Sequence, residues 1–194
     1  MASDSDNPLI FGEVLFDCFP DGREELGGAP FNVAWNLQAL GLSPVLISRV
    51  GNDVRGRLIL DMAASWGMDS AGLQIDELYP TGKVQIELAQ GEPSFTILPD
   101  QAYDHIVEPE IAHHRPAFLY HGSLVLRNET SRSTLNTLKH KLRCPIFLDV
   151  NLRNPWWDVR QVKALVHAAT WLKLHDSELD TLFPGREKMA ARCR

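Results

Sequence analysis

Short apolar stretches alternate with amphipathic ones along most of this 194-residue chain, and this rhythm constrains the fold more than any other feature. The apolar stretches have the length of buried strands. They lie at residues 10–16, 45–50, 117–121, 146–150 and 171–174. Strands that alternate with helices in this way predict an α/β fold, a doubly wound and mostly parallel sheet with helices on its faces.

End signals and apolar spacing define the helices between these strands. The first is expected over residues 30–40, since Pro30 suits a first turn and Gly41 ends the pattern. The second begins near Asn52 or Asp53 and ends at Gly67. Their predicted buried faces are Val33, Leu37 and Leu40, and Val54, Leu58 and Met62. Later helices are expected through Leu135, Leu138 and Leu142, through Val162, Leu165 and Val166, and from Asp176 or Ser177.

Residues 81–98 break this rhythm. Val84, Ile86 and Leu88 alternate with polar residues, a turn follows at residues 90–93, and alternation then resumes. This pattern predicts a β-hairpin with one solvated face, inserted between α/β units. We therefore expect one domain over residues 1–194, with a small β-sheet lid built from segments at about 14–26 and 81–99.

Composition excludes several classes of function. The formal net charge of −6 argues against nucleic-acid or anionic membrane surfaces, which need clustered Lys and Arg. Apolar runs fall short of a membrane span, and residues 1–8 are too polar for a signal peptide. Cys18, Cys144 and Cys193 show no zinc or disulfide spacing, which suits free thiols in the cytoplasm.

The end of the sequence suggests an incomplete fold. Residues 186–194 (REKMAARCR) carry little apolar content and complete no further strand. A doubly wound sheet that stopped here would leave a parallel strand without its neighbour. We therefore expect an incomplete, truncated version of the domain.

A glycine-rich turn before the first helix is the most specific local pattern. Gly27 and Gly28 would let a ligand approach the backbone, and Asn32 adds a side chain that both donates and accepts hydrogen bonds. The helix N-terminus offers unpaired amides. A structural turn with a structural Asn explains the same residues equally well, and neither a Walker loop nor GxGxxG is present.

Charged residues near strand ends are the other candidates. Asp17 sits at the end of the first expected strand, where a carboxylate can accept hydrogen bonds from two neighbouring hydroxyls of a ligand, or it belongs to the turn that follows. Asp149, Asn151 and Arg153 alternate at the end of a later strand, so they share a face; a structural ion pair between Asp149 and Arg153 competes with a binding role.

Two other groups are better explained structurally. His113 and His114 are adjacent, lack further ligands at metal spacing, and suit a solvated surface. Trp156 and Trp157 follow a proline and suit packing of a loop.

The residues around Gly27 to Gly51 resemble the N-terminal signature of the PfkB, or ribokinase-like, carbohydrate kinases, and within them the fructokinases. The resemblance runs from about Phe11 to Phe183. It is carried by Gly12-Glu13, Asp17, 27–34 (GGAPFNVA), 46–51 (LISRVG), 82–87, 92–97 (EPSFTI), 102–106 (AYDHI), 121–127 and 149–153 (DVNLR).

This resemblance implies a sugar kinase that transfers phosphate from ATP to D-fructose, with Mg²⁺. It implies that Asp17, Gly27, Gly28 and Asn32 hold the sugar. Asp149, Asn151 and Arg153 would border the site, with Arg153 near the phosphate or the sugar.

Lys173 to Glu178 resembles the family's Asn-x-x-Glu element, which would handle nucleotide phosphate and, indirectly, magnesium. Glu178 matches, but His175 replaces the Asn, and an N-capped helix start explains the segment equally well.

The catalytic base of such enzymes lies in a Gly-Ala-Gly-Asp-type turn, whose Asp accepts the hydroxyl proton and whose amides form an anion hole. The 194 residues contain no such motif. We therefore expect either a kinase represented by a chain that is inactive alone, or a non-catalytic sugar-binding or partner-binding half-domain, or a degenerate kinase fragment. A homodimer through the lid edge is a further expectation.

Overall fold

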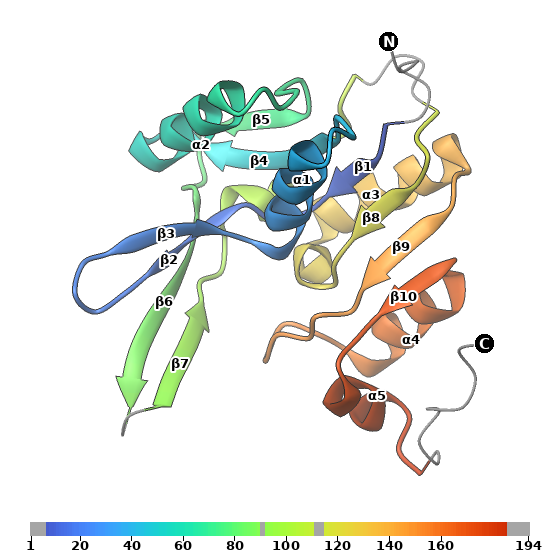
Figure 1. Ribbon diagram of the computed structural model, residues 1–194. Coiled ribbons are helices and arrows are strands. Elements are labelled where there is room, and N and C mark those ends of the chain that lie inside the picture. Colours follow the sequence, from blue (N-terminus) through green and yellow to red (C-terminus); the bar gives the residue numbers. More distant parts are fainter. Residues whose placement is uncertain (1–6, 90–91, 111–114, 186–194) are drawn as a thin grey trace.

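A computed structural model describes residues 7–89, 92–110 and 115–185. Figure 1 shows a twisted sheet flanked by helices and a smaller sheet that projects from one side. The large sheet is parallel throughout. Its order is β10 (Trp171–Lys173), β9 (Ile146–Asp149), β8 (Leu119–His121), β1 (Leu9–Phe11), β4 (Val45–Gly51) and β5 (Leu73–Asp76).

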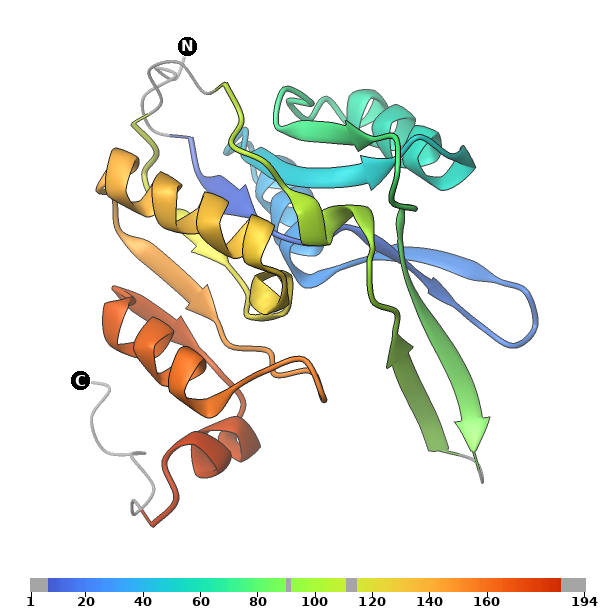
Figure 2. The same cartoon turned by 180° about the vertical axis from the view of Figure 1, so that it is seen from behind.

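Helices cover both faces of the large sheet. The helices are α1 (Ala29–Ala39), α2 (Val54–Ser65), α3 (Glu129–Leu142), α4 (Val159–Ala168) and α5 (Asp176–Leu182), with short 3-10 turns η1 (Ala102–His105) and η2 (Leu124–Arg127). Figures 1 and 2 show α1 and α2 on one face and α3 and α4 on the other. This arrangement confirms the doubly wound α/β architecture.

Alternate residues of β1 and β4 supply the two hydrophobic cores. Ile10 and Leu46 pack with Phe31 of α1 and Ile59 of α2. Leu9 and Ile47 belong to the opposite core, together with residues of α3. The strands are therefore buried on both sides, which explains why they read as continuous apolar runs.

The expected first strand at residues 10–16 is two strands in the structure. β1 ends at Phe11, Gly12 adopts φ 154°, and β2 (Leu15–Cys18) enters the small sheet. A β-carbon on Gly12 would collide with the ring of Pro30, so the chain passes close to α1 at this point. Asp17 accordingly lies on the small sheet and not at the end of a body strand.

The small sheet is mixed. Its order is β3 (Glu24–Gly27), β2, β6 (Gly82–Ala89) and β7 (Glu92–Ile97), with β2 and β6 parallel and the outer pairs antiparallel. These strands fall within the two segments expected to form a lid. The predicted alternation of β6 is confirmed, since Val84 and Ile86 are buried.

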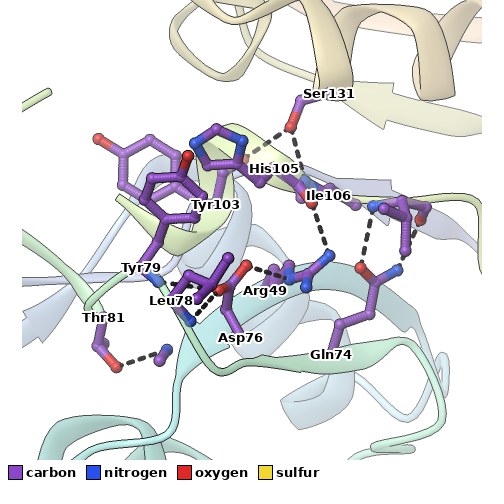
Figure 3. A network of polar contacts seen from close by, with 12 residues as sticks. Arg49, Gln74, Asp76, Leu78, Tyr79, Thr81, Tyr103, His105, Ile106 and Ser131 are labelled. Carbon is purple, nitrogen blue, oxygen red and sulfur yellow. Dashed lines mark hydrogen bonds and ion pairs between the residues drawn. The ribbon is translucent and has the colours of Figure 1, made fainter. Parts of the chain in front are cut away.

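A polar network fixes the point where the chain leaves the body for β6 (Figure 3). Arg49 pairs with the buried Asp76 at 2.7 Å and donates to the carbonyl of His105 at 2.9 Å. Asp76 also accepts from the amides of Leu78 and Tyr79. Beside them the Thr81 hydroxyl accepts from the amide of Gly51. The network holds β4, β5 and η1 around the start of β6.

A second ion pair holds the chain where it returns from β7. Arg127 forms two bonds of 2.7 Å to Asp104, and both side chains are almost fully buried. The same guanidinium donates to the carbonyl of Leu98, just after β7. Both connections to β6 and β7 are thus held by charged groups.

The buried face of α2 differs from the expectation. Val54 is 74% exposed and Leu58 46% exposed, whereas Gly56, Ile59 and Ala63 face the sheet. A β-carbon on Gly56 would collide with the carbonyl of Gly51, so α2 lies unusually close to β4. Leu40, which follows the last residue of α1, is likewise exposed, and Phe31 and Ala34 of α1 are buried instead.

Several sequence-based expectations lie outside the described residues. These are the His113-His114 pair, the turn residues 90 and 91, the terminal residues 186–194 and Cys193. Cys18 and Cys144 are described, and both are free thiols. Within residues 7–89, 92–110 and 115–185, none of the helices combines the length and apolar character needed to cross a bilayer.

Candidate functional site

The site lies where the order of the large sheet changes direction. From β1 the chain adds β4 and β5 on one side, and β8 then returns to the other side of β1. Open α/β sheets bind ligands at the carboxyl ends of their strands at such a switch point. A cavity of about 440 Å³ opens there, between the body and the small sheet. We call it the central cavity.

The central cavity collects polar groups from both sheets. Its lining comprises Glu13, Leu15, Asp17, Gly28, Ala29, Asn32, Val84, Phe95, Ile97, Leu124, Asp149, Asn151, Arg153 and Lys173. Seven of the nine predicted site residues are among them. Gly27 approaches the same site, since a β-carbon there would lie 3.0 Å from the Asp17 carboxylate. Glu178 lies in a neighbouring cavity.

This neighbouring cavity of about 590 Å³ continues along β9 and β10; we call it the adjoining cavity. It is lined by Asp149, Asn151, Leu152, Arg153, Asn154, Trp157, Lys173, Leu174, His175, Ser177, Glu178 and Thr181. Asp149, Asn151, Arg153 and Lys173 line both cavities. A ligand in one cavity therefore shares a wall with a ligand in the other.

Asp17 faces the central cavity from β2, where it pairs with Glu25 on β3. Its side chain is partly buried, and burial raises its carboxyl pKa. The negative charge of Glu25 raises this pKa further, and Arg153 opposes both effects. Asp17 and Arg153 thus interact electrostatically across the cavity.

Gly28 caps the N-terminus of α1 with φ 103° and ψ 126°, a conformation suited to glycine. Asn32, one turn later, lines the cavity with an exposed side chain. The first turn of α1 thus presents a hydrogen-bonding amide and helix N–H groups at one wall.

Asp149 is 4% exposed, and its Oδ2 accepts two hydrogen bonds. The Tyr120 hydroxyl donates at 2.9 Å and the Lys173 ammonium at 2.7 Å. The sequence suggested Arg153 as a structural ion-pair partner of Asp149, but in the structure this partner is Lys173. β9 ends at Asp149 and Asn151 has φ 41°, so these residues share the cavity through a turn and not through strand alternation.

Glu178 holds the start of α5. Its Oε1 accepts from the amide of Leu152 at 2.6 Å, and its Oε2 accepts from the amide of His175 at 2.8 Å. The His175 side chain caps the same helix through the amide of Ser177. Both carboxylate oxygens are thus engaged by backbone amides, which is the capping arrangement that the sequence allowed.

The donor set does not fit a protein-held metal ion. Within the described part of the chain, no cluster of three or more His, Cys, Asp or Glu side chains has the arrangement to hold one. Glu178 would also have to give up its two amide partners. Lys173 and Arg153, in contrast, offer positive charge on the wall between the two cavities.

Glu13 was overlooked as a site residue. It follows β1 directly, is 2% exposed and is among the residues that line the central cavity; its Oε2 is buried and has no hydrogen-bond partner in the described structure. Burial raises its pKa from 4.5 to about 7, although the charge of Arg153 works against this rise. The available signal was a single glutamate within an otherwise apolar predicted strand.

Tyr120 was also missed as a partner of the site. The hydroxyl lies on the buried strand β8, and burial raises its pKa above the ordinary value, with Asp149 adding to the effect. Tyr120 therefore stays protonated and serves as a hydrogen-bond donor to Asp149.

A doubly wound sheet with a polar cavity at its switch point, faced by a small mixed sheet, defines an α/β protein with a cavity suited to a small polar molecule. Comparison with known proteins narrows this class. The family model "pfkB family carbohydrate kinase" matches residues 17–190, and the chain belongs to this family.

Sequence similarity to individual sugar kinases supports the family assignment. The chain is 32% identical over 180 residues to a protein of Pyrococcus horikoshii named as a sugar kinase, covering 85% of this chain and 58% of that protein. It is 29% identical over 207 residues to a fructokinase of Klebsiella pneumoniae, covering 94% of this chain and 66% of the fructokinase. The chain thus spans about three fifths of the length of these relatives.

Solved structures resemble the fold. Fructokinase from Vibrio cholerae O395 superposes with a TM-score of 0.77 at 26% identity, covering 92% of this chain and 66% of that one. The uncharacterized sugar kinase of Pyrococcus horikoshii in complex with ATP gives a TM-score of 0.77 at 27% identity, covering 90% and 65%. The fold is therefore the ribokinase-like one expected from the sequence.

Proposed function

We propose that this chain supplies the sugar-binding part of a fructokinase-like kinase, which converts ATP and D-fructose to ADP and fructose 6-phosphate. One observation carries the proposal: polar groups from the small sheet, α1 and the end of β9 converge on a single cavity at the switch point. The fructokinase relatives support D-fructose as the substrate.

The chemistry of the cavity suits a polyhydroxylated ligand. Asp17 offers two acceptor oxygens to neighbouring hydroxyls, and Asn32 can both donate and accept. Leu124, Phe95 and Ile97 supply apolar surface beside them. A volume of about 440 Å³ lies in the range usual for small-molecule sites.

Phosphate groups of ATP would lie toward the adjoining cavity. Lys173 stands on the shared wall with its ammonium held by Asp149, and Arg153 lines both cavities. These two cations suit an anionic nucleotide tail. We assign Glu178 to positioning this wall, because its hydrogen bond to Leu152 ties the loop after β9 to α5.

Phosphoryl transfer needs a base and an anion hole, and the Gly-Ala-Gly-Asp-type turn that would supply both by resemblance does not occur in these 194 residues. In this proposal they belong to a longer product that includes this chain. A non-catalytic sugar-binding half-domain is the second candidate. Both candidates require the central cavity to bind the sugar.

The small sheet is assigned the role of a lid. Leu15 and Asp17 of β2 and Val84 of β6 line the cavity, so a shift of this sheet would change access to the ligand. The outer strands β3 and β7 have free edges, which could pair with the lid of a second copy.

An assay of ADP release from Mg-ATP tests the catalytic part of the proposal. D-fructose is compared with D-ribose and with a nucleoside, and the phosphorylated product is identified. The longer product is expected to respond to D-fructose, whereas the 194-residue chain is expected to bind the sugar without turnover. Failure of both proteins to bind or phosphorylate any of the three would overturn the assignment.

A further inference from the structure

Glu13 occupies the crossing between the two sheets. It lies in the link that joins β1 of the body to β2 of the small sheet. Its carbonyl is in close contact with Gly28, where the chain returns from the small sheet to α1. Glu13 is also among the residues that line the central cavity. A ligand held between body and lid would therefore lie next to this carboxyl.

Glu13 differs from the other buried carboxylates of the described chain. Asp76 pairs with Arg49, Asp104 pairs with Arg127, and Asp149 bonds to Tyr120 and Lys173. In contrast, the Oε2 of Glu13 is buried without a partner.

An unpaired buried polar atom costs about 1–3 kcal/mol, and more for a charged group. A buried carboxyl that lines a cavity and lacks a protein partner indicates that a ligand or bound water supplies the partner.

We propose that Glu13 is a further sugar-binding and specificity-determining residue, whose free Oε2 accepts a hydrogen bond from a hydroxyl of the ligand. This inference rests on the proposed function, since it assumes that a polyhydroxylated molecule fills the central cavity. It adds a second carboxylate below Asp17, so the ligand is held from the lid and from the floor at once. A ligand without a hydroxyl at that position would leave Glu13 unpaired and bind less well.

The charges around Glu13 decide which protonation state accepts the ligand. Arg153 and Arg127 favour the ionised form, while Asp149 and burial oppose it. Asp17 and Lys173 line the same cavity. Because the pKa of Glu13 is raised to about 7, the empty protein carries a mixture of both forms at neutral pH. A ligand hydroxyl that donates a hydrogen bond prefers the ionised carboxylate as its acceptor. Binding of the ligand therefore favours the deprotonated form of Glu13.

Proton linkage turns this into a measurable effect. With a pKa near 7 in the empty protein, affinity for the sugar should fall about tenfold between pH 8 and pH 6. The pKa of Asp17 is raised too, and His175 lines the adjoining cavity. The contribution of Glu13 to the pH dependence of the affinity must therefore be isolated by substitution.

Titration calorimetry of D-fructose into the 194-residue chain at pH 6, 7 and 8 tests the role. Glu13→Gln is expected to weaken binding about tenfold at pH 8 and to remove most of the pH dependence. Glu13→Met, which keeps the volume without polar atoms, should weaken binding further. Glu77→Gln serves as the control, since Glu77 is exposed and bonds to Asn52. Thermal unfolding verifies that each variant is folded.

The outcomes separate the two proposals. Wild-type affinity that Glu13→Gln and Glu13→Met leave unchanged at every pH overturns the role of Glu13 alone. A wild-type chain that is folded but binds no D-fructose at any pH overturns the proposed sugar site and, with it, this role.

Discussion

Gly28 lies directly against the carbonyl oxygen of Glu13: a β-carbon on Gly28 would come within 2.6 Å of that oxygen. The chain leaves the body at Glu13 and returns at Gly28, so two of the links between body and small sheet pack backbone against backbone. This contact fixes the floor of the central cavity, to which both residues contribute.

Gly28→Ala should therefore destabilise the fold more than an ordinary glycine substitution. Its φ of 103° disfavours a side chain, and the collision with Glu13 adds to the strain. We expect a loss of about 3 kcal/mol in the free energy of unfolding, measured by urea denaturation. Gly22→Ala is the matched control, because Gly22 has φ 85° but open space around it, and should cost about 1 kcal/mol. Equal losses would mean that the close approach is unimportant.

Asp17→Asn should weaken the binding of D-fructose. The substitution removes a charged acceptor but keeps the shape of the side chain, and hydrogen bonds to charged groups contribute about 1.5–3 kcal/mol. This corresponds to a loss of about tenfold or more in affinity, measured by calorimetry. Asp21→Asn, in the exposed turn between β2 and β3, should bind like the wild type. The proposal for Asp17 fails if the two variants cannot be distinguished.

The sequence predicts most strands of the large sheet well, but it does not predict where the chain passes from the large sheet to the small one. The apolar runs of β4, β8, β9 and β10 located these strands within a few residues, whereas the edge strand β5 was not predicted. The first expected strand was not located in this way, because the strand-like run continues through Gly12 and Glu13 while the chain changes sheet. The close contact of Gly12 with Pro30 is a tertiary effect that strand periodicity does not report.

The same limit applies to α2 and to the site. Apolar spacing favoured Val54 and Leu58, but Gly56, Ile59 and Ala63 are the buried residues, because Gly56 allows α2 to lie closer to β4 than a larger side chain would. Glu13 belongs to the Gly12-Glu13 pair that carries the family resemblance, but the resemblance gave it no role, and its lack of a hydrogen-bond partner is visible only when its neighbours are placed. The Asp149–Lys173 pair joins two neighbouring strands, a relation that strand order sets.

Arg127→Met should destabilise the fold strongly. It leaves the buried Asp104 without its partner and frees the carbonyl of Leu98 after β7. Breaking a buried ion pair by removing one partner costs about 3–5 kcal/mol. Adding Asp104→Asn to Arg127→Met removes the stranded charge and should recover part of this loss, as a urea double-mutant cycle would measure. No recovery would show that the pair is not coupled as described.

Glu13→Gln should be more stable than the wild type at high pH. The native carboxyl, with its pKa raised from 4.5 to about 7, binds its proton more tightly than the unfolded chain does. Wild-type stability therefore falls as pH rises from about 4.5 to 7, and the full loss is present above pH 7.

The rise in the pKa of Glu13 corresponds to about 3 kcal/mol at most. The free energy of unfolding of Glu13→Gln should therefore exceed that of the wild type by up to this amount at pH 8 and should equal it at pH 4. His121 is buried with its pKa lowered to about 3, but it contributes equally to both proteins and cancels in the difference. A difference that is constant with pH would contradict the assigned environment of Glu13.

The most direct test of the account is thermal unfolding of the purified chain in D-fructose. A ligand that binds the native state must raise the unfolding temperature, and the rise must grow with ligand concentration. We predict a cooperative transition that D-fructose raises in the wild type and raises much less in Asp17→Asn. A cooperative transition that D-fructose leaves unchanged, or that shifts equally in both proteins, would contradict a sugar site in the central cavity.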